Sequence, residues 1–171
     1  FWGSGRDEGN SLNVMVGPRT YSKTATSSAP DLPSGWSFNV VTQNLYDALK
    51  SDPRFGATIL DIKALKAAGE ADYIGGYQDT GYFLNKFLPR KTDVRTGGGA
   101  AELNYKQNTY VMRLADTYLM EAEALGSGAR AQALLDAVRA RVGLPSVPVT
   151  LQAIKNERRM EFAGEGLRFF D

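Results

Sequence analysis

Hydrophobic positions are spaced most regularly in the second part of the chain. Over residues 111–125, apolar side chains recur at steps of three and four residues, which places them on one face of a helix. Glycines within residues 126–128 then end that helix and form a short turn. The same spacing continues over residues 129–142, after which Gly143 suits a helix cap and Pro145 keeps the helix from resuming. The pattern predicts two helices that fold back on each other as an αα-hairpin.

A third helix is predicted after a proline-containing connection. Thr150 is suited to cap this helix, and Leu151, Ile154, Met160 and Phe162 supply its apolar positions. Alanine-rich helices paired through tight turns are typical of tetratricopeptide-type packing, and one such pair is visible in the sequence. Residues 106–171 are therefore predicted to form a helical hairpin followed by a C-terminal helix.

The first part of the chain, residues 1–105, has a weaker pattern and is rich in loops. One helix is predicted over residues 42–50, and Pro53 ends it because the residue before a proline disfavours helical geometry. The polar run over residues 21–35 is typical of an extended surface loop. Three short strands are predicted from the apolar stretches LNVMV, ATILDI and GYFLNKFL, which cover residues 12–16, 57–62 and 81–88. We expect one domain, mainly α with loop-rich and short β segments.

Composition narrows the chemistry that the chain can perform. The 171 residues carry a net charge of +1 and no basic stripe, so nucleic-acid binding has little electrostatic support. Cysteine and histidine are both absent, which excludes thiolate and imidazole metal sites, a cysteine nucleophile and a Ser-His-Asp triad. Carboxylate acid–base chemistry, lysine or tyrosine chemistry and all-oxygen metal sites are the classes that survive.

Four stretches together resemble one known family. They read YVMRLADTYLMEAEAL, LLDAVRARVGLP, IKNERRMEFAGEGLRFFD and, more weakly, NLYDALKSDPRFGATI, and they lie in the expected order over residues 44–171. They are similar to motifs of the RagB/SusD family of outer-membrane nutrient-binding lipoproteins from Bacteroidota-type bacteria. Asp116 stands where the family usually has Glu. The resemblance implies a SusD-like fold, of which residues 1–171 form the C-terminal portion.

The resemblance also implies a function and a location. Such proteins are not enzymes: they capture glycans, or peptides in some members, and deliver them to a SusC-like TonB-dependent transporter barrel. By this resemblance the protein is a surface-exposed lipoprotein of the outer membrane, held by a lipid anchor outside this chain, and it needs no cofactor. Two rival functions remain open at this point, a helical-repeat scaffold that binds another protein and a carboxylate-based glycoside hydrolase.

The charged C-terminal stretch decides between catalysis and structure. Glu157, Glu161 and Glu165 are spaced by four and line up on one helix, as a pair of glycosidase carboxylates could. The alternative, which we favour, is that these carboxylates form structural salt bridges with arginines. Candidate partners are Arg158 or Arg168 for Glu161, and Glu121, Glu123 or Glu157 for Arg113.

Loop aromatic residues are the candidate ligand contacts, because sugar rings stack on aromatic faces while their hydroxyls meet polar side chains. Trp36, between Gly35 and Ser37, is the first candidate platform. The stretch YIGGYQDTGY is the second, because its glycines allow Tyr73 and Tyr77 to be held outward. The alternative for each aromatic is that it packs a loop onto the core. The full set comprises Trp2, Tyr21, Trp36, Tyr73, Tyr77 and Tyr82, with Asp79, Gln78, Arg54 and Asn39 as polar partners.

Two glycine-rich stretches and three further tyrosines give weaker evidence about function. The stretch GSGRDEGN lacks the alternating oxygen ligands and closing Glu of an EF-hand, so we expect no metal site there. The stretch TGGGAAEL lacks the Lys-Ser/Thr of a phosphate-binding loop and is expected to be a connector. Tyr105, Tyr110 and Tyr118 lie in or beside the predicted hairpin and are expected in the core.

Overall fold

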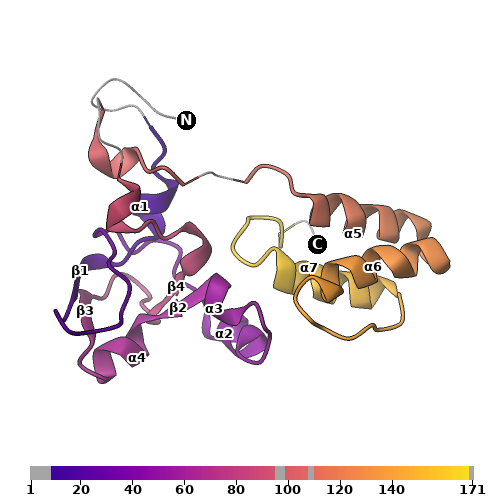
Figure 1. The fold of residues 1–171 in the computed structure, drawn as a ribbon, viewed down its shortest axis with the longest axis horizontal. Coiled ribbons are helices and arrows are strands. Elements are labelled where there is room, and N and C mark those ends of the chain that lie inside the picture. Colours follow the sequence, from indigo (N-terminus) through magenta and orange to yellow (C-terminus); the bar gives the residue numbers. More distant parts are fainter. Residues whose placement is uncertain (1–8, 95–98, 108–109, 170–171) are drawn as a thin grey trace. The chain divides into compact units, whose positions relative to one another are not determined.

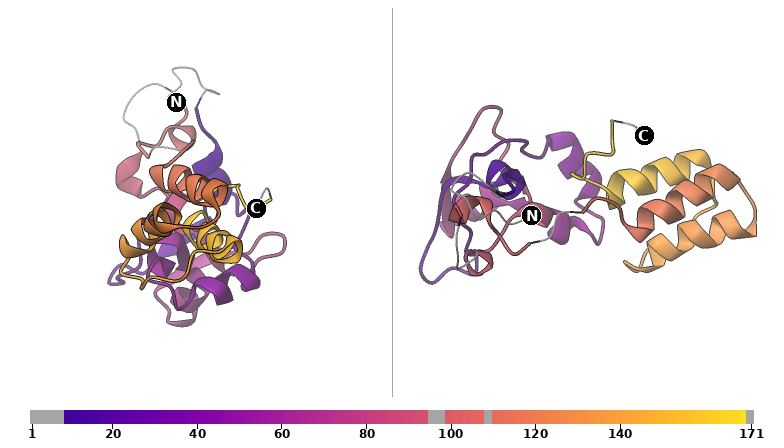
Figure 2. Two further views of the ribbon diagram at one scale, coloured as in Figure 1. Left: turned by 90° about the vertical axis from the view of Figure 1, so that its right-hand side faces the viewer. Right: turned by 90° about the horizontal axis from the view of Figure 1, so that it is seen from above.

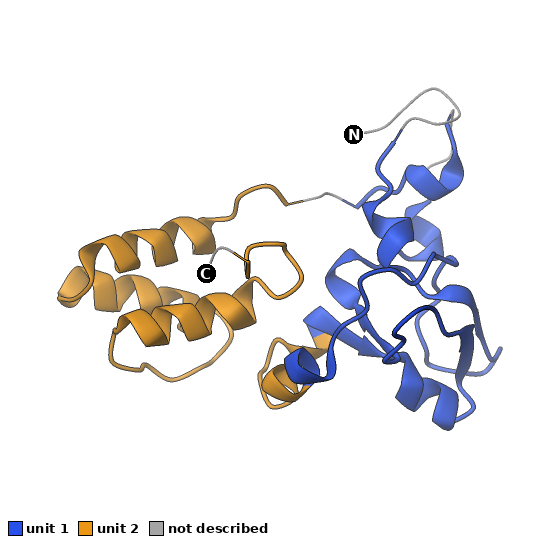
Figure 3. Cartoon of the chain, turned by 180° about the vertical axis from the view of Figure 1, so that it is seen from behind, with its two compact units in different colours: residues 1–46, 57–109 blue, residues 47–56, 110–171 orange. Residues whose placement is uncertain are grey.

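The computed structural model describes residues 9–94, 99–107 and 110–169. The chain divides into two compact units, which Figure 3 distinguishes by colour. Unit 1 comprises Phe1–Tyr46 and Ala57–Thr109, and unit 2 comprises Asp47–Gly56 and Tyr110–Asp171. Apart from one upstream segment, the boundary between the units lies between residues 109 and 110. The short segment Asp47–Gly56 is different, because it belongs to the helical unit although it lies far upstream in the sequence.

Unit 2 is built on three helices, α5 (Leu114–Leu125), α6 (Ala129–Ala140) and α7 (Leu151–Glu161). They lie side by side in Figures 1 and 2, and each contacts the other two. The predicted hairpin and third helix are confirmed, although α5 begins three residues later than its periodic pattern. Gly126 and Gly128 have φ of 70° and 94°, values that favour glycine and allow the tight turn between α5 and α6. Thr150 caps α7 by accepting a hydrogen bond from the amide of Ala153.

The core of unit 2 contains the residues that the helical pattern predicts. One buried cluster joins the three helices and consists of Leu119, Ala122, Ala131, Leu134, Leu135, Val138, Ile154 and Phe162. Tyr118 packs against it, as expected, whereas Tyr110 precedes α5 and is half exposed, which corrects its assignment to the core. Two members of the cluster on neighbouring helices are small alanines, Ala122 on α5 and Ala131 on α6.

Unit 1 contains two small antiparallel sheets and short helices. Strand β1 (Arg19–Lys23) pairs with β3 (Ala71–Ile74), and β2 (Ile59–Asp61) pairs with β4 (Tyr82–Leu84). Helix α1 (Leu12–Val16) precedes β1, and α4 (Ile62–Ala67) lies between β2 and β3 in the sequence (Figure 1). Single 3₁₀ turns follow at Asn85–Phe87, Lys91–Asp93 and Ala101–Leu103. The two remaining helices, α2 (Gln43–Leu49) and α3 (Phe55–Thr58), each contain residues of both units.

Several elements of unit 1 differ from the sequence-based expectation. The predicted helix over residues 42–50 and the strands within residues 57–62 and 81–88 are confirmed by α2, β2 and β4. The predicted strand LNVMV is wrong: these residues form α1, in which the polar Asn13 is buried and donates to the carbonyl of Phe87. Strands β1 and β3 were not predicted, because β1 is polar at four of its five positions and buries one side chain.

Candidate functional site

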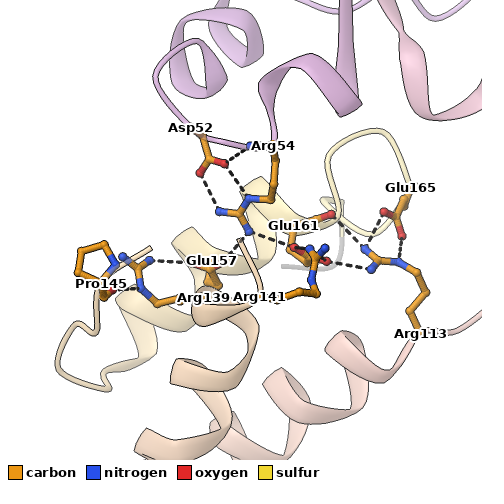
Figure 4. A network of polar contacts seen from close by, with 9 residues as sticks. All are labelled: Asp52, Arg54, Arg113, Arg139, Arg141, Pro145, Glu157, Glu161 and Glu165. Carbon is orange, nitrogen blue, oxygen red and sulfur yellow. Dashed lines mark hydrogen bonds and ion pairs between the residues drawn. The ribbon is translucent and has the colours of Figure 1, made fainter. Parts of the chain in front are cut away.

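The first candidate site is the group of carboxylates on α7. Glu157 and Glu161 are both buried, with 2% of their surface exposed, and Figure 4 shows them surrounded by guanidinium groups. Glu157 accepts hydrogen bonds from Arg54 Nη1 at 2.6 Å and from Arg139 Nη1 at 2.7 Å. Each of its two oxygens therefore has a charged partner.

Glu161 has still more partners. Arg54 Nη1 lies 3.1 Å from one carboxylate oxygen, Arg113 Nη1 lies 2.9 Å from the other, and Arg141 Nη2 bonds both at 2.7 and 2.8 Å. Arg113 also holds Glu165 through two parallel hydrogen bonds of 2.8 and 2.9 Å. Bidentate contacts of this kind fix geometry as well as charge.

Arg54 is part of this network, which corrects its assignment as a ligand contact. Arg54 is 6% exposed, and its guanidinium donates to both oxygens of Asp52, at 2.7 and 2.8 Å, in addition to Glu157 and Glu161. All of these residues belong to unit 2. Arg54 thus connects the segment Asp47–Gly56 to helix α7, and its hydrogen-bonding groups face carboxylates of its own unit.

The contacts within the network favour the ionised forms of Glu161 and Arg54. Burial by itself raises the pKa of the Glu161 carboxyl, but hydrogen bonds from Arg113 and Arg54 outweigh burial, and the pKa lies below its ordinary value. Burial opposes the charge of Arg54, yet its contacts with Asp52 and Glu157 raise the pKa of that guanidinium overall. A glycosidase acid needs a raised pKa and access to a sugar bond. Glu161 has neither property.

The remaining predicted ion pairs have other partners than expected. Arg158 pairs with Asp116 at 2.7 Å instead of Glu161. Arg113 pairs with Glu161 and Glu165, while Glu121 pairs with Arg130 on the surface. The physical reason is that Arg113 lies in extended backbone before α5, so its side chain does not share a helix face with Glu121. Arg168 is exposed and makes no ion pair with any residue that the structure describes.

The second candidate site is a pair of exposed aromatic rings in unit 1. Trp36 and Phe38 are 46% and 53% exposed, with ring centroids 6.1 Å apart and ring planes inclined at 68°. The amide of Trp36 donates to the carbonyl of Val14, and the amide of Phe38 donates to that of Met15, both at 2.8 Å. These carbonyls lie in the last turn of α1 and have no partner within the helix. The end of α1 therefore fixes the backbone that bears the two rings.

A third exposed aromatic, Tyr77, lies on a neighbouring segment. It is 88% exposed, and the adjacent Gly76 packs so closely on Ser37 that an added Cβ atom would lie 3.1 Å from the Ser37 Cβ. Further along, the hydroxyl of Thr80 donates to the carbonyl of Val41 at 2.6 Å. Residues 36–41 and 75–82 thus run against each other, and both carry exposed rings.

The backbone of these two segments is strained. Ser37, Asn39 and Gln78 have φ of 58°, 53° and 55°, which is uncommon for residues other than glycine. Conformations of this kind cost about 1–3 kcal/mol each and gather at functional sites, where surrounding structure holds them in place. Here Ser37 is held by its amide, which donates to Gly17, and by its hydroxyl, which accepts from the amide of Arg19.

Other predicted aromatic contacts are buried, which corrects the expectation that they face a ligand. Tyr73 is buried on β3, and its hydroxyl donates to Asp79 at 2.7 Å. Tyr82 is buried on β4 with its ring stacked on Tyr46, and the hydroxyl of Tyr21 donates to the carbonyl of Pro30. Trp2 lies outside the described residues. Sequence reasoning missed Phe38, although its spacing of two from Trp36 was a signal that both could share one side of an extended segment.

The comparisons with known proteins identify the family. A sequence profile of the SusD family matches residues 3–171. The chain belongs to the SusD family. A curated SusD-like protein of Bacteroides ovatus is 35% identical over 102 residues, which cover 56% of this chain and 19% of that protein.

Solved structures of SusD family proteins share the fold. A laminarin-binding SusD-like protein is 73% identical with a TM-score of 0.92, over 96% of this chain and 36% of that one. Surface glycan-binding protein A from Bacteroides thetaiotaomicron, in complex with laminarihexaose, is 29% identical with a TM-score of 0.82, over 95% and 36%. The protein of the same name from Bacteroides uniformis is 31% identical with a TM-score of 0.77, over 97% and 35%. The chain thus spans about a third of the length of these relatives, and the mainly helical fold with few short strands is confirmed.

Two further features of this SusD family chain concern metals and membranes. Within residues 9–94, 99–107 and 110–169, no group of three or more acidic, cysteine or histidine side chains is placed to hold a metal ion. The stretch GSGRDEGN lies almost entirely outside those ranges. No helix in the described part of the chain has both the length and the apolar character needed to span a bilayer.

Proposed function

We propose that this SusD family chain binds glycans and that Trp36, Phe38 and Tyr77 form its stacking surface, named here the aromatic surface. The observation that carries this proposal is that three exposed rings project from two segments that brace each other. A sugar ring presents a patch of C–H groups that stacks on an aromatic face. Exposed rings on a fixed backbone bind such a patch without first having to be ordered.

Polar groups beside the aromatic surface complete the proposed site. Asn39 and Gln78 are exposed on the same two segments, and their amide groups each offer both hydrogen-bond donors and an acceptor to sugar hydroxyls. Uncharged amides suit a neutral glycan, since a buried charge would need a counter-charge that the ligand lacks. Arg54 has no part in this proposal, because its guanidinium is occupied within unit 2.

The proposed ligand class is a glucan of the laminarin type. Support comes from the relatives, of which one is described as laminarin binding and another was solved with laminarihexaose. The first of them is 73% identical over nearly the whole of this chain. A peptide ligand, the alternative implied by RagB-like members, is the competing outcome in the binding assay.

We also propose that the protein captures and delivers its ligand without breaking bonds. The carboxylates that could have served as a catalytic pair are buried and bound to arginines, which supports a structural use. Delivery to a TonB-dependent transporter, and a position on the outer-membrane surface, are proposals about the whole protein, of which this chain corresponds to about a third in its relatives. Co-purification of the whole protein with an outer-membrane barrel tests the proposed delivery.

Isothermal titration calorimetry with laminarin tests the proposed binding. We expect the 171-residue chain to bind laminarin, and Trp36→Ala and Tyr77→Ala each to weaken binding about tenfold or more, which corresponds to about 1.4 kcal/mol. Tyr110→Ala is the matched control, because it removes a half-exposed tyrosine from unit 2. Binding that is absent, or that survives both substitutions, contradicts the proposal. Release of shorter sugars from laminarin contradicts the non-enzymatic role.

A further inference from the structure

Asp79 lies next to the aromatic surface but its carboxylate is turned back toward the protein. One oxygen accepts the hydrogen bond from the Tyr73 hydroxyl at 2.7 Å, and the other accepts from the amide of Gly81 at 3.3 Å. The same carboxylate also packs against Gly75, where the loop of residues 75–81 begins: a Cβ atom added to Gly75 would lie 3.1 Å from Oδ2 of Asp79. Asp79 therefore touches both ends of the loop that carries Tyr77.

Tyr73 connects this contact to the core of unit 1. Tyr73 is 8% exposed, and its ring meets Phe83 edge-on, with centroids 5.5 Å apart; Phe83 is fully buried on β4. Burial and the hydrogen bond to Asp79 both raise the pKa of the Tyr73 phenol, so its hydroxyl remains a donor at neutral pH. The packing on Phe83 holds the ring, and with it the hydroxyl, in place, and Asp79 attaches the loop to that hydroxyl.

We infer that Asp79 and Tyr73 are positioning residues for the aromatic surface: their hydrogen bond closes the loop of residues 75–81, keeps Gly76 packed on Ser37 and thereby positions Tyr77. This inference rests on the proposed function. It reassigns two residues that the sequence suggested as ligand contacts. Tyr73 cannot stack on a sugar because its ring is buried, and Asp79 acts through the loop. Without the hydrogen bond, the loop can relax the strained backbone at Gln78 and becomes less ordered. Glycan binding then has to order the loop, which weakens affinity.

A double-mutant cycle distinguishes positioning from contact. Laminarin affinity is measured by calorimetry for the 171-residue chain and for Tyr73→Phe, Asp79→Ala and the double variant. We expect each single variant to weaken binding about three- to tenfold, as the loss of one hydrogen bond to a charged group allows. The double variant should be no weaker than Asp79→Ala, because both substitutions remove the same interaction. Asp79→Asn should stay within about twofold, because its amide can donate to the Tyr73 oxygen.

Tyr21→Phe is the matched control for Tyr73→Phe. Tyr21 is also a buried tyrosine of unit 1 with a 2.7 Å hydrogen bond, but it donates to Pro30, outside the loop. We expect it to change thermal stability without changing affinity. If Asp79→Ala does not fold, the test is the comparison of Tyr73→Phe with Tyr21→Phe: a loss of affinity in Tyr73→Phe alone supports the inference, and equal affinity in the two variants overturns it.

The outcomes separate this inference from the proposed function. If Tyr73→Phe binds like the unchanged chain, or if the two single effects add, Asp79 contacts the glycan directly and the inference is overturned. If Trp36→Ala and Tyr77→Ala leave affinity unchanged, the proposed function itself has failed. Losses at Trp36, Tyr77, Tyr73 and Asp79, with Tyr73 and Asp79 non-additive, support both.

Discussion

Arg54 and Glu157 are 103 positions apart in the sequence, and their side chains meet at 2.6 Å inside unit 2. The same guanidinium nitrogen lies 3.1 Å from Glu161. Arg54 binds the short segment Asp47–Gly56 to helix α7 through both carboxylates. Because every one of these charged groups is almost fully buried, the pairing has consequences for stability that a surface ion pair would not have.

Arg54→Ala should destabilise the protein strongly. Removing the guanidinium leaves Glu157 and Glu161 with fewer counter-charges in a buried site, which costs about 3–5 kcal/mol in free energy of unfolding. Urea unfolding measures the difference. Arg130→Ala is the control, because Arg130 pairs with Glu121 on the surface, where solvent screens the pair, and its loss should cost far less stability. Equal losses of stability in the two variants would contradict a structural role for the buried ion pairs of Arg54.

Acid should weaken the helical unit. The pKa of Glu161 in the folded protein lies below its ordinary value of 4.5, so its contribution to stability is complete above that value. It is lost as the pH falls through the folded-state pKa, and the lowered pKa of Asp52 acts in the same direction. Helical circular dichroism during unfolding at a series of pH values measures this.

Glu161→Gln tests the assignment of that acid sensitivity. The variant cannot gain a proton at this position, so its stability should depend less steeply on pH below about 4.5 than that of the unchanged chain. It should also be less stable near neutral pH, because three arginines lose a charged acceptor. An unchanged pH slope would show that other carboxyls determine the acid response.

Close backbone packing beneath Trp36 gives a third prediction. A Cβ atom added to Gly35 would lie 2.5 Å from both the Gly17 Cα and the Val14 carbonyl oxygen, so Gly35→Ala must displace the segment that bears Trp36 and Phe38. We expect a loss of stability of about 1–3 kcal/mol, as overpacking typically causes, together with weaker laminarin binding. Gly56→Ala is the matched control, because nothing lies within 4 Å of its added Cβ. Unchanged binding in Gly35→Ala would contradict the role of this packing.

The helical unit could be predicted from the sequence, and the loop-rich unit only in part. Apolar residues that recur every three or four positions lie on one face of a helix, and that face must be buried. The pattern therefore predicted α5, α6 and α7. Strands β1 and β3 pair mainly with each other and leave one face to solvent, so a polar sequence such as RTYSK gives no apolar alternation to detect.

The candidate site was harder to predict because exposure is a tertiary property. Tyr73 and Tyr77 lie four residues apart around the same two glycines, yet one is buried and the other is 88% exposed. Local sequence does not distinguish them, since Tyr73 is buried by packing on Phe83 and by its hydrogen bond to Asp79. Likewise the partners of Glu157 and Glu161 come from distant segments, whereas sequence spacing considers neighbours on one helix.

The inclination between Trp36 and Phe38 leads to a prediction about ligand shape. Because their ring planes differ by 68°, one flat face cannot stack on both rings. A β-1,4-linked glucan is a flat ribbon, whereas the β-1,3 linkages of laminarihexaose make the chain curve, so successive sugars present differently oriented faces. We expect laminarihexaose to bind about tenfold more tightly than cellohexaose, which has the same six glucose units. Calorimetry with the two hexasaccharides measures this difference, and Phe38→Ala should reduce it by removing the second orientation. Equal affinities would mean that a single ring supplies the stacking, and the inclined pair would then have no part in selecting the glycan.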